Sequence, residues 1–216
     1  MKKAALHNLG CKVNAYETEA MQHLLEEAGY EIVPFTQKAD VYVINTCSVT
    51  NMADRKSRQM LHKAKKNNPD SIVVAAGCYV QTSEKEVLND LSVDIVIGND
   101  RKHDLVRLLE EYSLDSVNDT VDDINDGKHD FEELFIDQTK EHTRAFIKVQ
   151  DGCNQFCSYC IIPYARGRVR SRRFENVIAE VERLAANGFK EVVLTGIHLS
   201  SYGVDFEEAT GLLELI

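Results

Sequence analysis

Residues 71–78 read SIVVAAGC, an uninterrupted apolar run that ends in a glycine and a cysteine. Such a run is typical of a strand that is buried on both faces of a parallel sheet. Two similar runs occur upstream, KAALHNLGC at residues 3–11 and DVYVINTC at residues 40–47. Helix-like stretches separate the three runs, so this part of the chain predicts an α/β fold with a doubly wound parallel sheet.

The stretches around these runs complete a first domain, which is expected over residues 1–112. Residues 14–29 have the apolar spacing of a helix. Asn14 is expected to cap this helix, with Glu17 at the capping-box position. Residues 50–67 predict a strongly basic helix. Further elements are expected at residues 84–91 (helix), 93–98 (strand) and 101–112 (helix).

Residues 113–142 carry ten Asp or Glu against two Lys and show little periodicity. This composition predicts an acidic linker or a long exposed hairpin. From residue 143 a second α/β pattern begins, with a strand, a helix and a strand expected at 144–150, 175–188 and 190–196. A complete eight-unit parallel barrel takes about 250 residues. Residues 143–216 therefore predict only the start of a barrel, which is truncated.

The net charge of −10 arises largely from the acidic segment. It does not exclude a nucleic-acid partner, because the local field decides such binding. No run of about 18 apolar residues is present, so we expect no membrane span. Six cysteines without a secretory signal indicate a reducing compartment. We therefore expect a cytoplasmic protein whose cysteines are metal ligands or catalytic groups.

Three cysteines lie within eight residues of the segment GCNQFCSYCIIPYARG, residues 152–167. They follow an expected strand, at the end where α/β folds bind ligands. Four thiolates saturate a cubane iron–sulfur cluster, whereas three leave one iron open. An open iron can bind a substrate, as the open position of catalytic zinc does. These three cysteines are Cys153, Cys157 and Cys160.

A zinc site and unliganded cysteines are the alternatives for this segment. Structural zinc usually takes four protein ligands, often as two CxxC pairs. Here only one CxxC is present, and His142 and His198 are possible but unpatterned ligands.

The other cysteines, Cys11, Cys47 and Cys78, each follow a different apolar run. In a parallel sheet the carboxyl ends of the strands open on one side. The three thiols are therefore expected to converge, although three independent buried cysteines remain the alternative.

CNQFCSYC resembles the CxxxCxxC signature of radical S-adenosylmethionine (radical SAM) enzymes. The motifs LGCKVNAYETE, VINTCSVT, AAGCY, IPYARGRVRSR and LTGIHLSSYG extend this likeness, and the whole chain resembles the methylthiotransferase family. The resemblance implies that the 153–160 cysteines hold a [4Fe–4S] cluster whose fourth iron binds S-adenosylmethionine. It also implies that Cys11, Cys47 and Cys78 bind a second [4Fe–4S] cluster involved in sulfur donation. Cofactor contacts are implied for Tyr159, Thr195 and Gly196, whereas His198 and Tyr202 are candidates only.

The resemblance implies a tRNA methylthiotransferase that adds a methylthio group to C2 of N6-threonylcarbamoyladenosine, next to the anticodon. The wording GCKVNAYETE resembles that branch of the family. tRNA and an electron donor such as a flavodoxin or a ferredoxin would be the partners. Alternatives are isopentenyladenosine in tRNA or a ribosomal-protein aspartate as substrate, a non-catalytic iron–sulfur protein for electron transfer or sensing, and an RNA-binding module alone.

Two basic clusters suit an RNA partner, because arginine and lysine contact phosphates. The alternatives are a solvated helix face for the second cluster and pairing with the cofactor carboxylate or acidic neighbours for the first. The first cluster comprises Arg166, Arg168, Arg170, Arg172 and Arg173, and the second includes Arg55 and Lys56.

Overall fold

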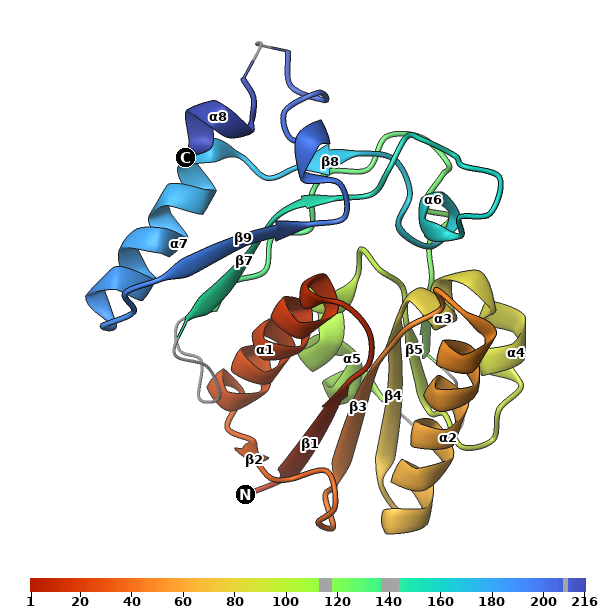
Figure 1. The fold of residues 1–216 in the computed structure, drawn as a ribbon. Helices are drawn as coiled ribbons and strands as arrows, with labels where there is room; N and C mark the ends of the chain where they lie inside the picture. The colour runs from red at the N-terminus through yellow and green to blue at the C-terminus, as the bar shows by residue number, and fades with distance from the viewer. Residues whose placement is uncertain (113–117, 137–143, 208–209) are drawn as a thin grey trace.

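A computed structural model describes residues 1–112, 118–136, 144–207 and 210–216 of the chain, which forms two sheets (Figure 1). The larger sheet has the order β2-β1-β3-β4-β5-β6, and every neighbouring pair is parallel. Its strands are β1 (Lys3–Asn8), β2 (Glu31–Ile32), β3 (Val41–Thr46), β4 (Ile72–Gly77), β5 (Ile95–Ile97) and β6 (Asn118–Thr120).

Helices cover both faces of the larger sheet, as a doubly wound fold requires. On one face α1 and α5 pack against the strands through Met21, Leu25 and Leu108. On the other face α2 packs through Leu61 and Ala64. The helices of this part are α1 (Lys12–Glu27), α2 (Asn51–Asn67), α3 (Cys78–Thr82), α4 (Glu84–Leu88), the 3-10 turn η1 (Lys102–Asp104) and α5 (Leu105–Glu111). The predicted doubly wound sheet is confirmed.

The smaller sheet has the order β8-β7-β9. β7 and β9 are parallel and α7 connects them, whereas β8 is antiparallel to β7. Its elements are β7 (Ala145–Asp151), α6 (Ile162–Arg166), β8 (Arg170–Ser171), α7 (Phe174–Ala186), β9 (Val192–Gly196), the 3-10 turn η2 (Leu199–Ser201) and α8 (Leu212–Leu215). The unit β7–α7–β9 is the parallel repeat from which a barrel of this class is built.

A third core joins the two sheets. Tyr16 and Ala20 on α1 are in one buried cluster with Ile147 of β7 and Leu184 of α7. Helix α1 therefore packs against its own sheet on one side and against the second sheet on another, as its central place in Figure 1 shows.

Residues 118–136 correct the prediction of an exposed acidic linker. β6 pairs with β5 as the edge strand of the larger sheet. Leu134 and Ile136 are buried in the third core, and Ile124 is 2% exposed. Apolar residues spaced among the acidic ones anchor this segment. Residues 113–117 and 137–142 lie outside the described residues, and the domain boundaries at 112 and 143 remain a prediction.

The start of α1 also differs from the prediction, because the helix begins at Lys12 after Cys11 rather than at an Asn14 cap. Glu17 is fully buried instead of capping the helix. Helix α2, Asn51–Asn67, matches the predicted helix at residues 50–67 to within one residue. The Thr50 hydroxyl caps it by accepting a hydrogen bond from the Ala53 amide at 3.1 Å. Within the described residues, no helix combines the length and the apolar character that crossing a membrane requires.

Candidate functional site

The structure brings Cys11, Cys47 and Cys78 together. Each follows the carboxyl end of β1, β3 or β4, and these three strands are neighbours in the parallel sheet. Gly10 lies so close to Cys47 that a Cβ on the glycine would be 3.0 Å from the Cys47 sulfur. Burial raises the pKa of Cys47, and the nearby Cys78 and Cys11 raise it further. Sheet topology alone therefore creates this group of thiols, which we call the first triad.

The second triad, Cys153, Cys157 and Cys160, lies on the loop that leaves β7. The loop is closed at its base, where the Cys153 amide donates to the Gly167 carbonyl at 3.0 Å. Gly152 has a φ of +71°, and a Cβ there would overlap the carbonyl oxygen of Arg168. The backbone can approach itself here only because the residue is glycine. Cys157 is exposed, and the other two thiols are partly exposed.

Phe156 between these cysteines has a φ of +46°, an uncommon conformation for a residue that is not glycine. The Arg168 guanidinium lies over its ring at 4.3 Å from the centroid. Tyr164 packs edge-on against the same ring, with 5.7 Å between the centroids. These contacts brace the loop at Phe156 and leave Cys157 exposed.

The donor chemistry of the two triads fits iron–sulfur clusters, which cysteine thiolates hold. All six cysteines are free thiols. In the described part of the chain, no three His, Cys, Asp or Glu side chains are grouped closely enough to hold one ion. A cluster spreads its thiolate ligands over separate irons. His198, a possible zinc ligand, is bonded through Nδ1 to the Ser201 hydroxyl at 2.6 Å. His142, the other one, lies outside the described residues.

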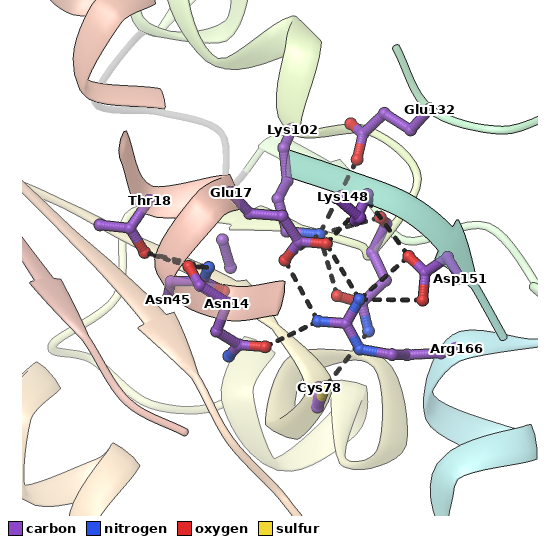
Figure 2. Close-up of polar contacts among 12 residues, drawn as sticks. Asn14, Glu17, Thr18, Asn45, Cys78, Lys102, Glu132, Lys148, Asp151 and Arg166 are labelled. Atoms are coloured by element: carbon purple, nitrogen blue, oxygen red, sulfur yellow. Dashed lines mark hydrogen bonds and ion pairs between the residues drawn. The ribbon is translucent and has the colours of Figure 1, made fainter. Parts of the chain in front are cut away.

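A buried charge network lies beside Cys78 of the first triad and connects α1 with β7 and α6 (Figure 2). At its centre is Arg166, which is fully buried at the end of α6. Its guanidinium donates to Glu17 on α1 at 2.9 and 3.1 Å. It also donates to both oxygens of Asp151 on β7, each at 3.0 Å. One side chain therefore ties the second triad's loop to both sheets.

Two lysines complete this network. Lys148 on β7 donates to Glu17 at 2.9 Å and to Asp151 at 3.2 Å. Lys102 reaches Glu17 at 3.4 Å. Burial alone would raise the pKa of Glu17 and Asp151, but the surrounding cations outweigh it and lower both. The carboxylates are therefore held ionised in the interior.

Sequence reasoning missed this network, apart from placing Arg166 in a basic cluster. Its members are far apart along the chain, so their pairing depends on the tertiary fold. One signal was available: Lys148 interrupts the apolar strand AFIKV, and a charged residue inside a buried strand needs a partner.

Burial contradicts the RNA-binding role predicted for three arginines, Arg166, Arg170 and Arg172. Arg172 is fully buried and pairs with Glu180 on α7 and with Glu133. Arg170 is 4% exposed, and its Nη2 donates to the carbonyl oxygen of Arg166 at 3.0 Å. Arg166 and Arg172 pair with acidic neighbours, which was the alternative to RNA binding.

The other predicted RNA contacts lie on the surface. Arg168 and Arg173 are exposed beyond the second triad's loop. Arg55 and Lys56 are exposed near the start of α2. That helix begins at Asn51, four residues after Cys47, so both surfaces follow a triad cysteine in the sequence. Their role in RNA binding stays a prediction.

The predicted cofactor contacts are placed near the end of β7. Thr195 is buried on β9, and a Cβ on Gly196 would lie 2.9 Å from the Gln150 side chain. Tyr159 is 90% exposed at the tip of the loop. The Tyr202 hydroxyl donates to the Arg172 carbonyl at 2.9 Å, which makes Tyr202 a satisfied structural residue. The cofactor roles of the first three remain predictions.

Comparisons with known proteins match the two parts separately. Residues 3–98 match the uncharacterized protein family UPF0004, and residues 147–215 match the radical SAM superfamily. The chain is 47% identical over 210 residues to the threonylcarbamoyladenosine tRNA methylthiotransferase MtaB of Bacillus subtilis, covering 96% of this chain and 46% of that protein. The corresponding MtaB of Aquifex aeolicus is 45% identical over 218 residues, covering 99% and 53%.

A more distant relative is the tRNA-2-methylthio-N(6)-dimethylallyladenosine synthase of a Thermoanaerobacter species, which is 35% identical over 219 residues and covers 98% of this chain and 46% of that protein. The chain spans about half the length of the curated relatives it matches. Among solved structures, the radical S-adenosylmethionine methyltransferase TsrM of Kitasatospora setae matches with a TM-score of 0.59 at 16% identity, covering 93% of this chain and 48% of that one. This last likeness concerns the fold alone.

Proposed function

We propose, from the membership of this chain in the radical SAM methylthiotransferase family, that the intact protein adds a methylthio group to C2 of N6-threonylcarbamoyladenosine in tRNA, next to the anticodon. The observation that carries the proposal is the pair of cysteine triads, at the strand ends of two sheets that share one buried charge network. Two relatives at 45–47% identity are named for this substrate.

Each triad would hold one [4Fe–4S] cluster, with three thiolates and one iron left open. When bound, the cluster at the 153–160 loop and S-adenosylmethionine would supply a 5′-deoxyadenosyl radical able to remove hydrogen from C2 of adenine. Cys153, Cys157 and Cys160, which are exposed or partly exposed, would hold this cluster. Cys11, Cys47 and Cys78, at the carboxyl ends of strands of the larger sheet, would hold the cluster involved in sulfur donation.

The other residues of the proposed site would bind RNA and S-adenosylmethionine. Arg168, Arg173, Arg55 and Lys56 are exposed cations that would contact RNA phosphates. Tyr159, Thr195 and Gly196 would line the S-adenosylmethionine site. A flavodoxin or a ferredoxin in the cytoplasm would supply the electron. The buried network would fix the position of α6 relative to α1 and β7.

Anaerobic reconstitution with iron and sulfide tests the cluster assignment. We expect about eight irons per chain, falling to about four in the Cys153→Ala/Cys157→Ala/Cys160→Ala variant. Zinc at one per chain, or about four irons that the variant leaves unchanged, would contradict two clusters on separate triads.

Substrate choice is tested with the intact protein in a strain that lacks its own methylthiotransferases. Mass spectrometry of tRNA nucleosides should show a methylthio derivative of N6-threonylcarbamoyladenosine. A methylthio derivative of isopentenyladenosine, or a modified aspartate in a ribosomal protein, would assign another substrate. Iron-loaded protein that cleaves no S-adenosylmethionine would indicate electron transfer or sensing. Unchanged tRNA binding after replacement of all six cysteines, without any product in the parent, would indicate an RNA-binding module.

A further inference from the structure

Asn99 connects the first triad to the segment that follows the second. This residue is fully buried just after β5. Its Nδ2 donates to the carbonyl oxygen of Ala165 on α6 at 2.6 Å. The same nitrogen donates to the Cys78 sulfur at 3.6 Å. One amide group therefore touches both a cysteine of the first triad and the helix that begins two residues beyond Cys160.

The orientation of the Asn99 amide is fixed by Lys102. The lysine ammonium group donates to the Asn99 Oδ1 at 2.9 Å and to its backbone oxygen at 2.8 Å. An ammonium group can only donate hydrogen bonds. Oδ1 must therefore face Lys102, and the Nδ2 hydrogens are left for Cys78 and Ala165.

A second asparagine links Arg166 to Cys11, but here the thiol is the donor and the amide oxygen accepts. The Asn14 Oδ1 accepts from the Arg166 guanidinium at 2.7 Å and from the Cys11 thiol at 3.6 Å. Arg166 thus lies beside the first triad, although it belongs to the segment after the second. Figure 2 shows its guanidinium between Asn14, Glu17, Asp151 and Cys78. Its pKa, which burial lowers, is raised overall by Asp151, Cys78 and Glu17.

Both groups act on charge at the Cys78 sulfur. A cluster gains one negative charge when it takes up one electron. Hydrogen bonds to the ligand sulfurs and nearby charge set the reduction potential of such a cluster. A hydrogen-bond donor and a buried cation both stabilise the reduced form. Glu17 and Asp151 offset part of the Arg166 charge, so its removal leaves two anions near the cluster.

We propose that Asn99 and Arg166 are positioning residues that raise the reduction potential of the cluster at Cys11, Cys47 and Cys78 and hold this cluster against α6. The inference rests on the proposed function only in that these three cysteines bind an iron–sulfur cluster.

The test is a redox titration followed by electron paramagnetic resonance, with dithionite as the one-electron donor. The background is the chain with Cys153→Ala/Cys157→Ala/Cys160→Ala, so that only the first triad holds a cluster. Asn99→Ala and Arg166→Gln should each move the midpoint potential to a more negative value. Arg166→Lys, which keeps the charge, should move it less than Arg166→Gln does.

Asn68→Ala is the matched control. Asn68 is 4% exposed, and its Nδ2 donates to the Ala39 carbonyl at 2.8 Å, before the amino end of β3 and therefore far from the cysteines. This variant should keep the parent potential, so that a general loss of packing is separated from the effect at Cys78.

Iron-loaded Asn99→Ala with an unshifted potential would overturn the inference. If Asn99→Ala does not take up iron, the isosteric Asn99→Asp decides, because it exchanges the donating amide for an acceptor. An unshifted potential in that variant, or a shift of equal size in Asn68→Ala, also overturns the inference. Failure of the parent background to bind any iron would instead overturn the proposed function.

Discussion

Gly152 shows how one residue without a side chain shapes the candidate site. Its φ of +71° lies in the left-handed region, and the Arg168 carbonyl occupies the space that a Cβ would need. The close approach lets Cys153 and Gly167 close the loop by a backbone hydrogen bond. A change at this position therefore acts on all three cysteines of the second triad.

We expect Gly152→Ala to lose the cluster of the second triad, so that reconstituted protein binds about four irons instead of about eight. The backbone conformation alone costs about 1–2 kcal/mol for a non-glycine residue, and the overlap with Arg168 adds to this. Gly127→Ala is the control, because its φ is +79° but nothing lies within 4 Å of the added carbon. Equal iron content in both variants would contradict the role of the close approach.

The pair of Arg172 and Glu180 makes a second prediction for single residues. Removing one partner of a buried ion pair leaves an uncompensated charge, which typically costs about 3–5 kcal/mol. Arg172→Ala should lower the free energy of unfolding by that amount in a urea titration. The neighbouring Arg173 is exposed and lies over the Phe206 ring, 5.6 Å from its centroid. Arg173→Ala should cost less than about 1 kcal/mol, and equal losses would show that burial of the pair has no special weight.

At the scale of elements, helix α1 makes three kinds of contact, with the larger sheet, with the smaller sheet and with the charge network. Met21 and Leu25 pack on the larger sheet, while Tyr16 and Ala20 pack on the smaller one. Glu17 and Asn14 face the charge network. The apolar spacing predicted the helix correctly. Asn14 and Glu17 were wrongly assigned to its cap, because Asn and Glu are common both at helix starts and in buried polar networks.

The elements that were predicted are those with a strong local signal. β1, β3 and β4 are continuous apolar runs, and α2 has a threonine cap. The short elements that were missed include α3 and α6, with five residues each, and β2 and β8, with two each. Such lengths are too short for periodicity to develop. β6 was missed because its acidic surroundings resemble a linker, and its place depends on pairing with β5.

The docking of α6 through Arg166 predicts a dependence of stability on pH. The folded-state pKa values of Glu17 and Asp151 are lowered below the values of about 4 expected in the unfolded chain. Stability from these groups is thus present above about pH 4–5 and is lost as the pH falls toward the folded-state pKa. Asp151→Asn should lower the free energy of unfolding at pH 7 and flatten its decline between pH 5 and 3.

Equilibrium urea unfolding at a series of pH values measures this profile. The control is Asp70→Asn, since Asp70 lies on the surface. It should reproduce the acid decline of the parent. A decline of the same steepness in Asp151→Asn would mean that the network contributes nothing to acid unfolding.

For the whole molecule, the third core decides how the two sheets behave together. Its residues come from α1, from the 134–136 segment and from the β7–α7–β9 unit. The cysteines could be identified as ligand candidates from spacing and strand ends alone. The contacts of Asn99 and Arg166 that connect the two triads could not be predicted, because they link residues dozens of positions apart in the sequence.

We expect one cooperative thermal transition for the chain, because the third core joins the two sheets through residues of α1. Calorimetry should give a single peak with equal calorimetric and van't Hoff enthalpies. Tyr16→Ala, which removes a fully buried ring from the third core, should lower the midpoint. Two separated transitions in the parent would show that the sheets unfold as independent domains.

Glu17 accepts ion pairs from three cations that lie on three different segments, Lys102, Lys148 and Arg166. Any lineage that exchanges this carboxylate for a neutral side chain leaves three interior cations short of a partner at once. Replacement of one lysine by a neutral residue should destabilise the fold less, because Glu17 keeps two other cations. Across the descendants of this sequence, Glu17 should therefore be the last of the four to vary, and its rare replacements should arrive together with changes at two or more of the cations.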